Sequence, residues 1–270
     1  MKPSGRFRIG AVSYLNTKPL VFGMESLAPE LEVVYDLPSR LADRLAAGEL
    51  EVALIPSIEV FQDPTYTIVS DACIGCRGPV LSVKLLSRVP AEQIKTLALD
   101  EGSRTSVALV RILLQQKFGV CPELVPFPIG SRIEQMETDA VLVIGDRAIH
   151  APSQPFSVQW DLGDQWCRWS ELPFVFAMWT ARAGIELGDI DEILRQSRDA
   201  GVTNLVSIAE AEANKVGIDV AACLAYLRDN LNFFLGPRER QGLELFYRHA
   251  AELNLAPKDL DLRFDDCQTS

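Results

Sequence analysis

Apolar stretches of strand length alternate with amphipathic stretches from the start of the chain. The sequence from Arg8 to Val12 predicts a strand, and a helix is predicted to begin near Thr17 with Pro19 in its first turn, where proline is tolerated. A second strand is predicted over residues 31–37. Alternation of this kind is typical of α/β proteins.

The next segment completes a repeating unit. Ser39 is predicted to cap an amphipathic helix that ends at Gly48, and residues 52–55 predict an apolar third strand. Near-continuous apolar strands separated by short helices indicate a mostly parallel sheet covered on both faces. Ligands of such sheets bind beyond the carboxyl ends of the strands, so the residues that follow Val12 and Ile55 are candidates for a binding site.

A second α/β unit follows. It begins with a predicted strand over 96–99, continues through a polar loop over 100–106, and leads into an amphipathic helix that ends at Gly119. Further strands are predicted over 124–127 and 140–144. The pattern therefore predicts a second lobe of the same class as the first.

The chain is predicted to return to the first lobe near its end. A strand is expected over 175–179, and long helical segments over 190–254 are expected to pack on the first lobe. Crossings around 80–90 and 173–180 suit two lobes that are joined by a two-segment hinge, with a ligand cleft between them. The predicted boundaries are residues 1–90 plus 178–270 for the first lobe and 91–177 for the second.

Charge and hydropathy restrict the partners. The 270 residues carry a net charge of −11, and no segment gathers Lys and Arg on one stripe, so nucleic acid and membrane surfaces are not expected partners. The sequence shows no secretory signal and no apolar run long enough to span a membrane, which predicts a cytoplasmic protein. An anion can still be bound, provided that backbone N–H groups and a few placed side chains reverse the local potential.

Cysteine and histidine give no pattern for metal chemistry. The six cysteines are scattered and suit reduced thiols without disulfides. Cys73 and Cys76 have CxxC spacing, but no second pair or nearby His completes a zinc set, so two small apolar residues at a strand end is the preferred interpretation. His249 fits a surface or packing role, and His150 is expected to lie outside the cleft rather than in it. No metal site is expected.

Polar residues instead converge at the predicted strand ends. Asn16 follows a strand and carries an amide that both donates and accepts, whereas any Ser or Thr there is equally explained as a helix cap. Arg77 suits a carboxylate fork, with a surface salt bridge as the alternative. The candidate site residues are Ser13, Tyr14, Asn16, Ser57, Arg77, Gly78, Ser82, Ser103, Arg104, Thr105, Ser106, Gly145 and Asp146.

Several longer segments carry a recognisable pattern. They are Ser13 to Leu20, Gly48 to Glu59, Arg77 to Val83, Ser103 to Leu109 and Leu172 to Ala177. Together, in the same order and over most of the chain, they resemble the chorismate dehydratases of the futalosine route to menaquinone. The resemblance implies a type II periplasmic-binding-protein-like fold and removal of water from chorismate to give 3-[(1-carboxyvinyl)oxy]benzoate, without a cofactor.

This chemistry requires both carboxylates of chorismate to be held and a base to be placed near ring atom C3. No histidine or lysine in these segments clearly supplies the base. One hypothesis is that the enolpyruvyl carboxylate of the substrate takes the proton, while Asn16 orients it and Ser82 binds a carboxylate. Asn16 and Ser82 are therefore the expected catalytic residues, and the other candidates are expected to bind substrate.

Two other functions stay open. A cytoplasmic binding protein would hold a small organic anion without consuming it, and the sister naphthoate-forming enzyme of the same route would share the fold and act on a nucleoside-derived substrate. The absence of a helix-turn-helix segment argues against a regulator. The sequence leaves open whether the protein is a monomer or a homodimer.

Overall fold

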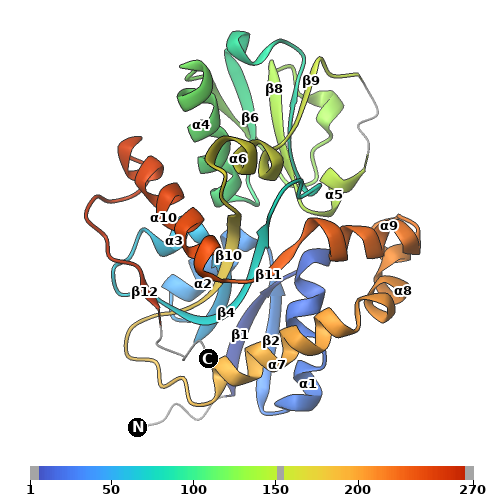
Figure 1. Cartoon of the computed structure of the whole chain (residues 1–270), viewed down its shortest axis with the longest axis vertical. Helices are drawn as coiled ribbons and strands as arrows, with labels where there is room; N and C mark the ends of the chain where they lie inside the picture. Colours follow the sequence, from blue (N-terminus) through green and yellow to red (C-terminus); the bar gives the residue numbers. More distant parts are fainter. Residues whose placement is uncertain (1–5, 151–154, 265–270) are drawn as a thin grey trace.

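The computed structural model describes residues 6–150 and 155–264. Two β-sheets with helices against their faces lie one above the other, and β4 and β10 run through the region between the two lobes (Figure 1). The two-lobed α/β architecture expected from the pattern is therefore confirmed.

The first sheet holds the N-terminal unit and most of the C-terminal strands. The strand β1 pairs in parallel with β2 and β3, which confirms the predicted βαβαβ unit. In sheet order its strands are β11 (Asn232–Phe234), β4 (Thr67–Cys76), β10 (Phe174–Ala181), β3 (Val52–Pro56), β1 (Phe7–Val12) and β2 (Leu31–Asp36), with β12 (Arg263–Phe264) paired to β4.

The second sheet has five strands. The strand β6 pairs in parallel with β7 and β8, as expected for the second unit. In sheet order its strands are β7 (Glu123–Phe127), β6 (Thr96–Asp100), β8 (Ala140–Ile144), β5 (Val83–Ser87) and β9 (Val158–Asp161).

Both sheets are mixed rather than mostly parallel. The strand β10 is antiparallel to β3 and β4, and β5 is antiparallel to β8 and β9. The physical reason lies in the connections, because β4, β5 and β10 adjoin the two crossings and a chain that crosses and returns enters a sheet from the opposite end. Sheet membership also differs from the predicted boundaries at 90/91 and 177/178, since β5 belongs to the second sheet and all of β10 to the first.

Helices cover the outer faces of both sheets. The helix α7 packs on β4, whereas α10 contacts β10 and also reaches α4 of the second lobe. The helices are α1 (Met24–Leu27), α2 (Pro38–Ala46), α3 (Ser57–Val60), α4 (Arg104–Phe118), α5 (Asp146–Ile149), α6 (Leu162–Ser170), α7 (Ile190–Thr203), α8 (Leu205–Val216), α9 (Val220–Ala225) and α10 (Pro237–Glu252), with 3-10 turns η1 (Leu15–Val21), η2 (Ala91–Gln93) and η3 (Ile133–Gln135) and the π-helical turn η4 (Tyr226–Asn230).

Three local predictions are corrected. The segment around Pro19 forms the 3-10 turn η1 rather than an α-helix, and a proline lacks the N–H that an α-helical interior needs. Leu37 occupies the N-cap position of α2 and Pro38 its first turn, so Ser39 is not the cap. The helix α4 begins at Arg104, before the expected Val107, because the Ser103 hydroxyl accepts a hydrogen bond from the Ser106 N–H at 3.2 Å and caps it.

Apolar packing is continuous through the first sheet and reaches the second. Every residue of β3 and of β10 is buried. The described cysteines are free thiols, and Cys267 lies outside the described residues. Within 6–150 and 155–264, no helix is both long enough and apolar enough to cross a membrane.

Candidate functional site

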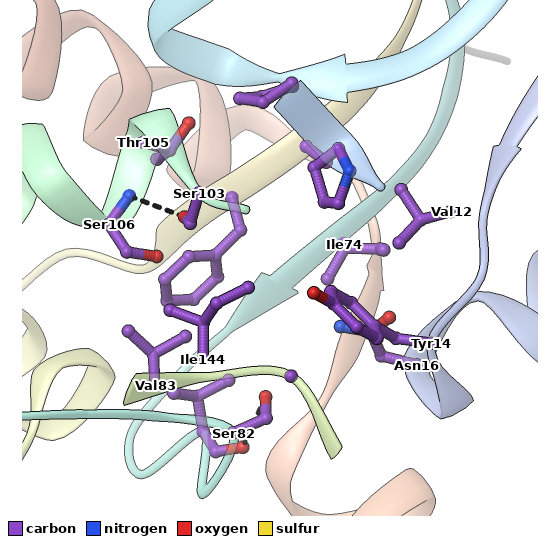
Figure 2. Close-up of a pocket in the computed structure, with 16 residues that line it drawn as sticks. Val12, Tyr14, Asn16, Ile74, Ser82, Val83, Ser103, Thr105, Ser106 and Ile144 are labelled. Carbon is purple, nitrogen blue, oxygen red and sulfur yellow. Dashed lines mark hydrogen bonds between the residues drawn. The ribbon is translucent and has the colours of Figure 1, made fainter. Parts of the chain in front are cut away.

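A pocket with an empty volume of about 500 Å³ lies between the two sheets (Figure 2). The pocket is lined by Val12, Tyr14, Asn16, Pro38, Pro56, Ile74, Val80, Ser82, Val83, Ser103, Thr105, Ser106, Ile144, Gly145, Phe176 and Ala177.

The first lobe contributes the end of β1 and the turn after it. Tyr14 and Asn16 come from this turn and lie beside each other in the pocket wall (Figure 2). Among the described residues, the Asn16 side chain makes one long hydrogen bond, in which its Oδ1 accepts from the Thr17 hydroxyl at 3.4 Å. The amide of Asn16 therefore keeps most of its hydrogen-bonding capacity for a ligand.

The second lobe contributes the N-terminus of α4. Ser103 caps this helix, and Ser103, Thr105 and Ser106 line the pocket. The Thr105 hydroxyl is already used across the cleft, because it accepts a hydrogen bond from the Ile58 N–H at 3.2 Å and lies 3.3 Å from the Ser57 hydroxyl. A helix N-terminus carries about half a positive charge, which favours an anion at this wall.

Ser82 forms a third wall with Val80 and Val83. Its carbonyl accepts a hydrogen bond from the Gly145 N–H at 2.9 Å, which ties it to the end of β8. Asp161 holds the preceding residues by accepting hydrogen bonds from the N–H groups of Val80 at 2.9 Å and Leu81 at 2.6 Å. The backbone around Ser82 is thus fixed by the second lobe.

Tyr14 links the two lobes at the edge of the pocket. A Cβ atom added to Gly145 would lie 2.8 Å from the Tyr14 ring, so the ring packs directly on this glycine. Burial raises the pKa of Tyr14, and the charge of Asp100 adds to the rise. Tyr14 therefore stays protonated and acts as a hydrogen-bond donor rather than as a base.

The structure brings together seven of the thirteen candidate residues from the sequence. Those that line the pocket are Tyr14, Asn16, Ser82, Ser103, Thr105, Ser106 and Gly145. The other six lie outside its lining.

Three of the six are close to the pocket but face elsewhere. Ser13 is exposed at the end of β1. Ser57 is fully buried behind Thr105 and donates a hydrogen bond to the Val175 carbonyl at 2.8 Å. Asp146 accepts a hydrogen bond from the Leu15 N–H at 3.0 Å, so it joins the lobes.

The remaining three lie outside the pocket, and the two arginines among them form ion pairs. Arg77 forms an ion pair with the buried Glu239 at 2.8 Å, and Gly78 follows it outside the pocket. Arg104 pairs with Asp43 and Glu59 of the first lobe, at 2.7 and 2.9 Å. The salt bridge that was the alternative interpretation of Arg77 is present, although its partner is buried rather than on the surface.

The apolar lining was missed by the sequence-based prediction. Phe176 and Ala177 lie in the crossing strand β10, and Ile74 lies in β4. Inside a strand such residues have the same pattern as core residues, so only the position of β10 between the lobes could have singled them out.

No charged residue lines this pocket in the described part of the chain. No group of three or more His, Cys, Asp or Glu residues within 6–150 and 155–264 is arranged to hold a metal ion. His150 lies 2.9 Å from the Val216 carbonyl and does not line the pocket. The arrangement can hold an anion through neutral donors and a helix N-terminus, and it offers no side-chain carboxylate, imidazole or amine as a base.

Comparisons with known proteins agree with this architecture. The chorismate dehydratase of Thermus thermophilus is 29% identical over 275 residues, which cover 92% of this chain and 96% of that protein. A protein of Archaeoglobus fulgidus superposes with a TM-score of 0.71 at 17% identity, over 92% of this chain and 97% of that one.

A second solved structure identifies the type of fold. The periplasmic aliphatic sulphonate binding protein of Escherichia coli superposes with a TM-score of 0.57 at 13% identity, over 100% of this chain and 96% of that one. The expected periplasmic-binding-protein-like fold is therefore confirmed. A family model described as menaquinone biosynthesis matches residues 7–252, and because this match spans most of its length, the chain belongs to the menaquinone biosynthesis family.

Proposed function

We propose that this protein is a chorismate dehydratase, a hydro-lyase that removes water from chorismate to give 3-[(1-carboxyvinyl)oxy]benzoate. The name of the Thermus thermophilus relative supports this substrate. The observation that carries the proposal is a pocket whose polar lining consists of uncharged side chains, three of them at the N-terminus of α4. Such a site suits a substrate that brings both its negative charges and its own base.

The substrate carboxylates are held by opposite walls in this proposal. The N-terminus of α4 binds one carboxylate through Ser103 and Ser106, which line the pocket at the start of this helix. Asn16 orients the enolpyruvyl carboxylate, and Ser82 binds a carboxylate from the third wall. Hydrogen bonds from preorganised donors strengthen as negative charge builds on the ring carboxylate.

The proton balance requires no protein base. The C3–H bond of chorismate breaks and its proton passes to the enolpyruvyl carboxylate of the same molecule. The C4–O bond breaks as the ring becomes aromatic, and the leaving hydroxide takes up the proton to form water. Tyr14 is the titratable residue among the described lining residues, and its raised pKa suits a donor instead of a base.

The test compares two substrates. Purified protein is incubated with chorismate and, separately, with the nucleoside-derived substrate of the sister enzyme, and products are separated by chromatography. Conversion of chorismate alone to the benzoate supports the proposal. Turnover of the other substrate alone would identify the sister enzyme, and tight binding of chorismate without product would identify a binding protein.

The cytoplasmic location and the lack of a cofactor expected from the sequence stay predictions. Activity of protein that has been dialysed against a chelator, in buffer without added cofactor, tests the second.

A further inference from the structure

The hydroxyl of Tyr226 is buried without a hydrogen-bond partner. The side chain is 1% exposed, and its hydroxyl satisfies hydrogen-bond geometry with no other atom of the described chain. Buried polar groups in native proteins are nearly always paired, so an orphaned hydroxyl calls for an explanation.

Tyr226 begins an unusual piece of backbone. It is the first residue of the π-helical turn η4, which follows α9. Single π-helical turns are rare and occur frequently at functional sites. The last residue of this turn, Asn230, donates a hydrogen bond from its side-chain amide to the Pro79 carbonyl at 2.9 Å. The turn therefore packs against the segment that leads to Ser82.

Ser82 has a fixed backbone and a loosely held hydroxyl. Its carbonyl is bonded to the Gly145 N–H, and Asp161 holds Val80 and Leu81. Leu81 has a φ of 60°, which a leucine adopts only under strong local constraint. The Ser82 hydroxyl, by contrast, reaches only the Val80 carbonyl, at 3.4 Å. Nothing else in the described chain sets the direction of its proton.

The two hydroxyls are neighbours. Burial raises the pKa of Tyr226, and the adjacent Ser82 side chain offsets part of that rise. The two side chains form no hydrogen bond in the structure, and a bond between them requires one of the two hydroxyl groups to turn toward the other. Because its pKa is raised, Tyr226 stays protonated and can donate a hydrogen bond. The Ser82 hydroxyl has one proton, so when Ser82 donates that proton to a ligand, Tyr226 must be the donor in the bond between the two residues.

We propose that Tyr226 is a positioning residue for Ser82: the phenol donates a hydrogen bond to the Ser82 Oγ and turns the serine's own proton toward a substrate carboxylate. The inference rests on the proposed dehydratase function, because it assigns the support of a residue that acts there. The turn η4 brings Tyr226 to Ser82, and the Asn230 contact with Pro79 fixes the turn against the same segment.

The kinetic test uses Tyr226→Phe, which removes only the hydroxyl. We expect kcat to fall about 10-fold with little change in KM, because one hydrogen bond is lost from the transition state. In a Ser82→Ala background the same change should have no further effect on kcat. A Tyr226→Phe variant with wild-type kcat, or an equal loss in both backgrounds, would overturn the inference.

The matched control is Tyr247→Phe. The Tyr247 hydroxyl donates to the Pro257 carbonyl at 3.0 Å and accepts from the Leu260 N–H at 2.7 Å, on α10. Tyr247 does not line the pocket. Its loss of a hydroxyl should lower the unfolding midpoint and leave kcat unchanged.

Thermal unfolding of the same variants, without substrate, separates failure of this inference from failure of the proposed function. The inference requires the phenol, which is unpaired in the structure, to donate to the Ser82 Oγ in solution. Tyr226→Phe should then lower the midpoint by about 2–4 °C in the wild-type background and not in the Ser82→Ala background. Loss of an unpaired buried hydroxyl would leave the midpoint unchanged or raise it, and that result would overturn the inference. Equal midpoint shifts in both backgrounds would overturn the inference even if chorismate is converted. A non-additive shift would sustain the contact between the two residues even if wild-type protein leaves chorismate unchanged.

Discussion

Asn16 illustrates how a pocket lined by uncharged side chains can bind a dianion. Its amide lines the pocket and makes one long hydrogen bond within the described part of the chain, so it can orient a carboxylate without the desolvation cost of an opposing charge. Neutral donors also remain in place when the substrate carboxylate becomes protonated. A lysine or arginine at this position would oppose that protonation.

The residue prediction concerns Asn16→Ala. We expect kcat for chorismate to fall by about 10²–10³, because a preorganised donor to the reacting carboxylate is lost. The measurement is initial rate against chorismate concentration. Ser13→Ala is the matched control, since Ser13 lies three residues earlier, is exposed and does not line the pocket. Equal kcat values for wild type and Asn16→Ala would exclude the assigned role.

Sequence patterns identified the polar half of the pocket and missed the apolar half. Asn16 and Ser82 could be predicted because each belongs to a recognisable segment between a strand and its neighbouring element. Arg77 could not be assigned, because its partner Glu239 is 162 residues away in the sequence. Phe176 was missed because a lining residue in a buried strand has the pattern of a core residue.

At the scale of elements, the turn between β8 and α5 joins the two lobes. Gly145 supports the Tyr14 ring and has a φ of 70°. The next residue, Asp146, accepts the hydrogen bond from the Leu15 N–H. This turn therefore sets how the second lobe meets η1, the element that carries Asn16.

Gly145→Ala tests that contact. The new methyl group would lie 2.8 Å from the Tyr14 ring, so the turn and η1 must move apart. The walls of the pocket are then displaced relative to each other. We expect kcat/KM for chorismate to fall by about 10-fold or more, equivalent to at least about 1.4 kcal/mol.

The control for Gly145→Ala is Gly130→Ala. Gly130 has a φ of 87° and no atom within 4 Å of an added Cβ, so this change also places a side chain at a positive φ but without the clash. Its kcat/KM should match that of wild type. Similar losses in the two variants would show that backbone strain, not the contact with Tyr14, causes the effect.

Asp146 predicts a pH dependence of stability. Burial raises the pKa of Asp146 above its ordinary value, despite the hydrogen bond from Leu15 and the charge of Lys18, which lower it. The folded state therefore binds this proton more tightly than the unfolded state does. The contribution of Asp146 to the free energy of unfolding should increase as pH falls from neutral through the raised pKa, and should level off below the ordinary pKa of 3.8.

Urea unfolding of wild type and Asp146→Asn at pH 7.5 and pH 5 measures this effect. The difference in unfolding free energy should move in favour of wild type at the lower pH, because asparagine cannot take up the proton. A difference that is independent of pH, or that moves the other way, would contradict the account of Asp146.

Element prediction was most accurate for the strands and least accurate at helix starts. The strands β1, β3 and β8 are recognisable as apolar runs, and all three lie within a residue or two of the expected positions. The start of α4 was placed late because Ser103 to Ser106 look like a polar loop, whereas the Ser103 cap already makes them helical. The antiparallel course of β10 depends on the path between the lobes, which no local pattern records.

At the scale of the whole molecule, the pocket exists only where the lobes meet. Thr105 and Arg104 at the start of α4 both bind residues of the first lobe, so these contacts hold the helix N-terminus at the pocket. A site between two lobes that excludes water strengthens each hydrogen bond to its ligand. The same architecture serves binding proteins, and in the proposed reaction the added chemistry comes from chorismate, whose aromatisation drives the elimination.

The most direct test of the proposed reaction is a single turnover of chorismate that carries deuterium at C3, with protein in excess over substrate. The account predicts that 3-[(1-carboxyvinyl)oxy]benzoate forms in an amount equal to the chorismate consumed, and more slowly than from unlabelled chorismate, because the C3–H bond breaks in the pocket. Recovery of intact labelled chorismate after incubation with excess protein would contradict it.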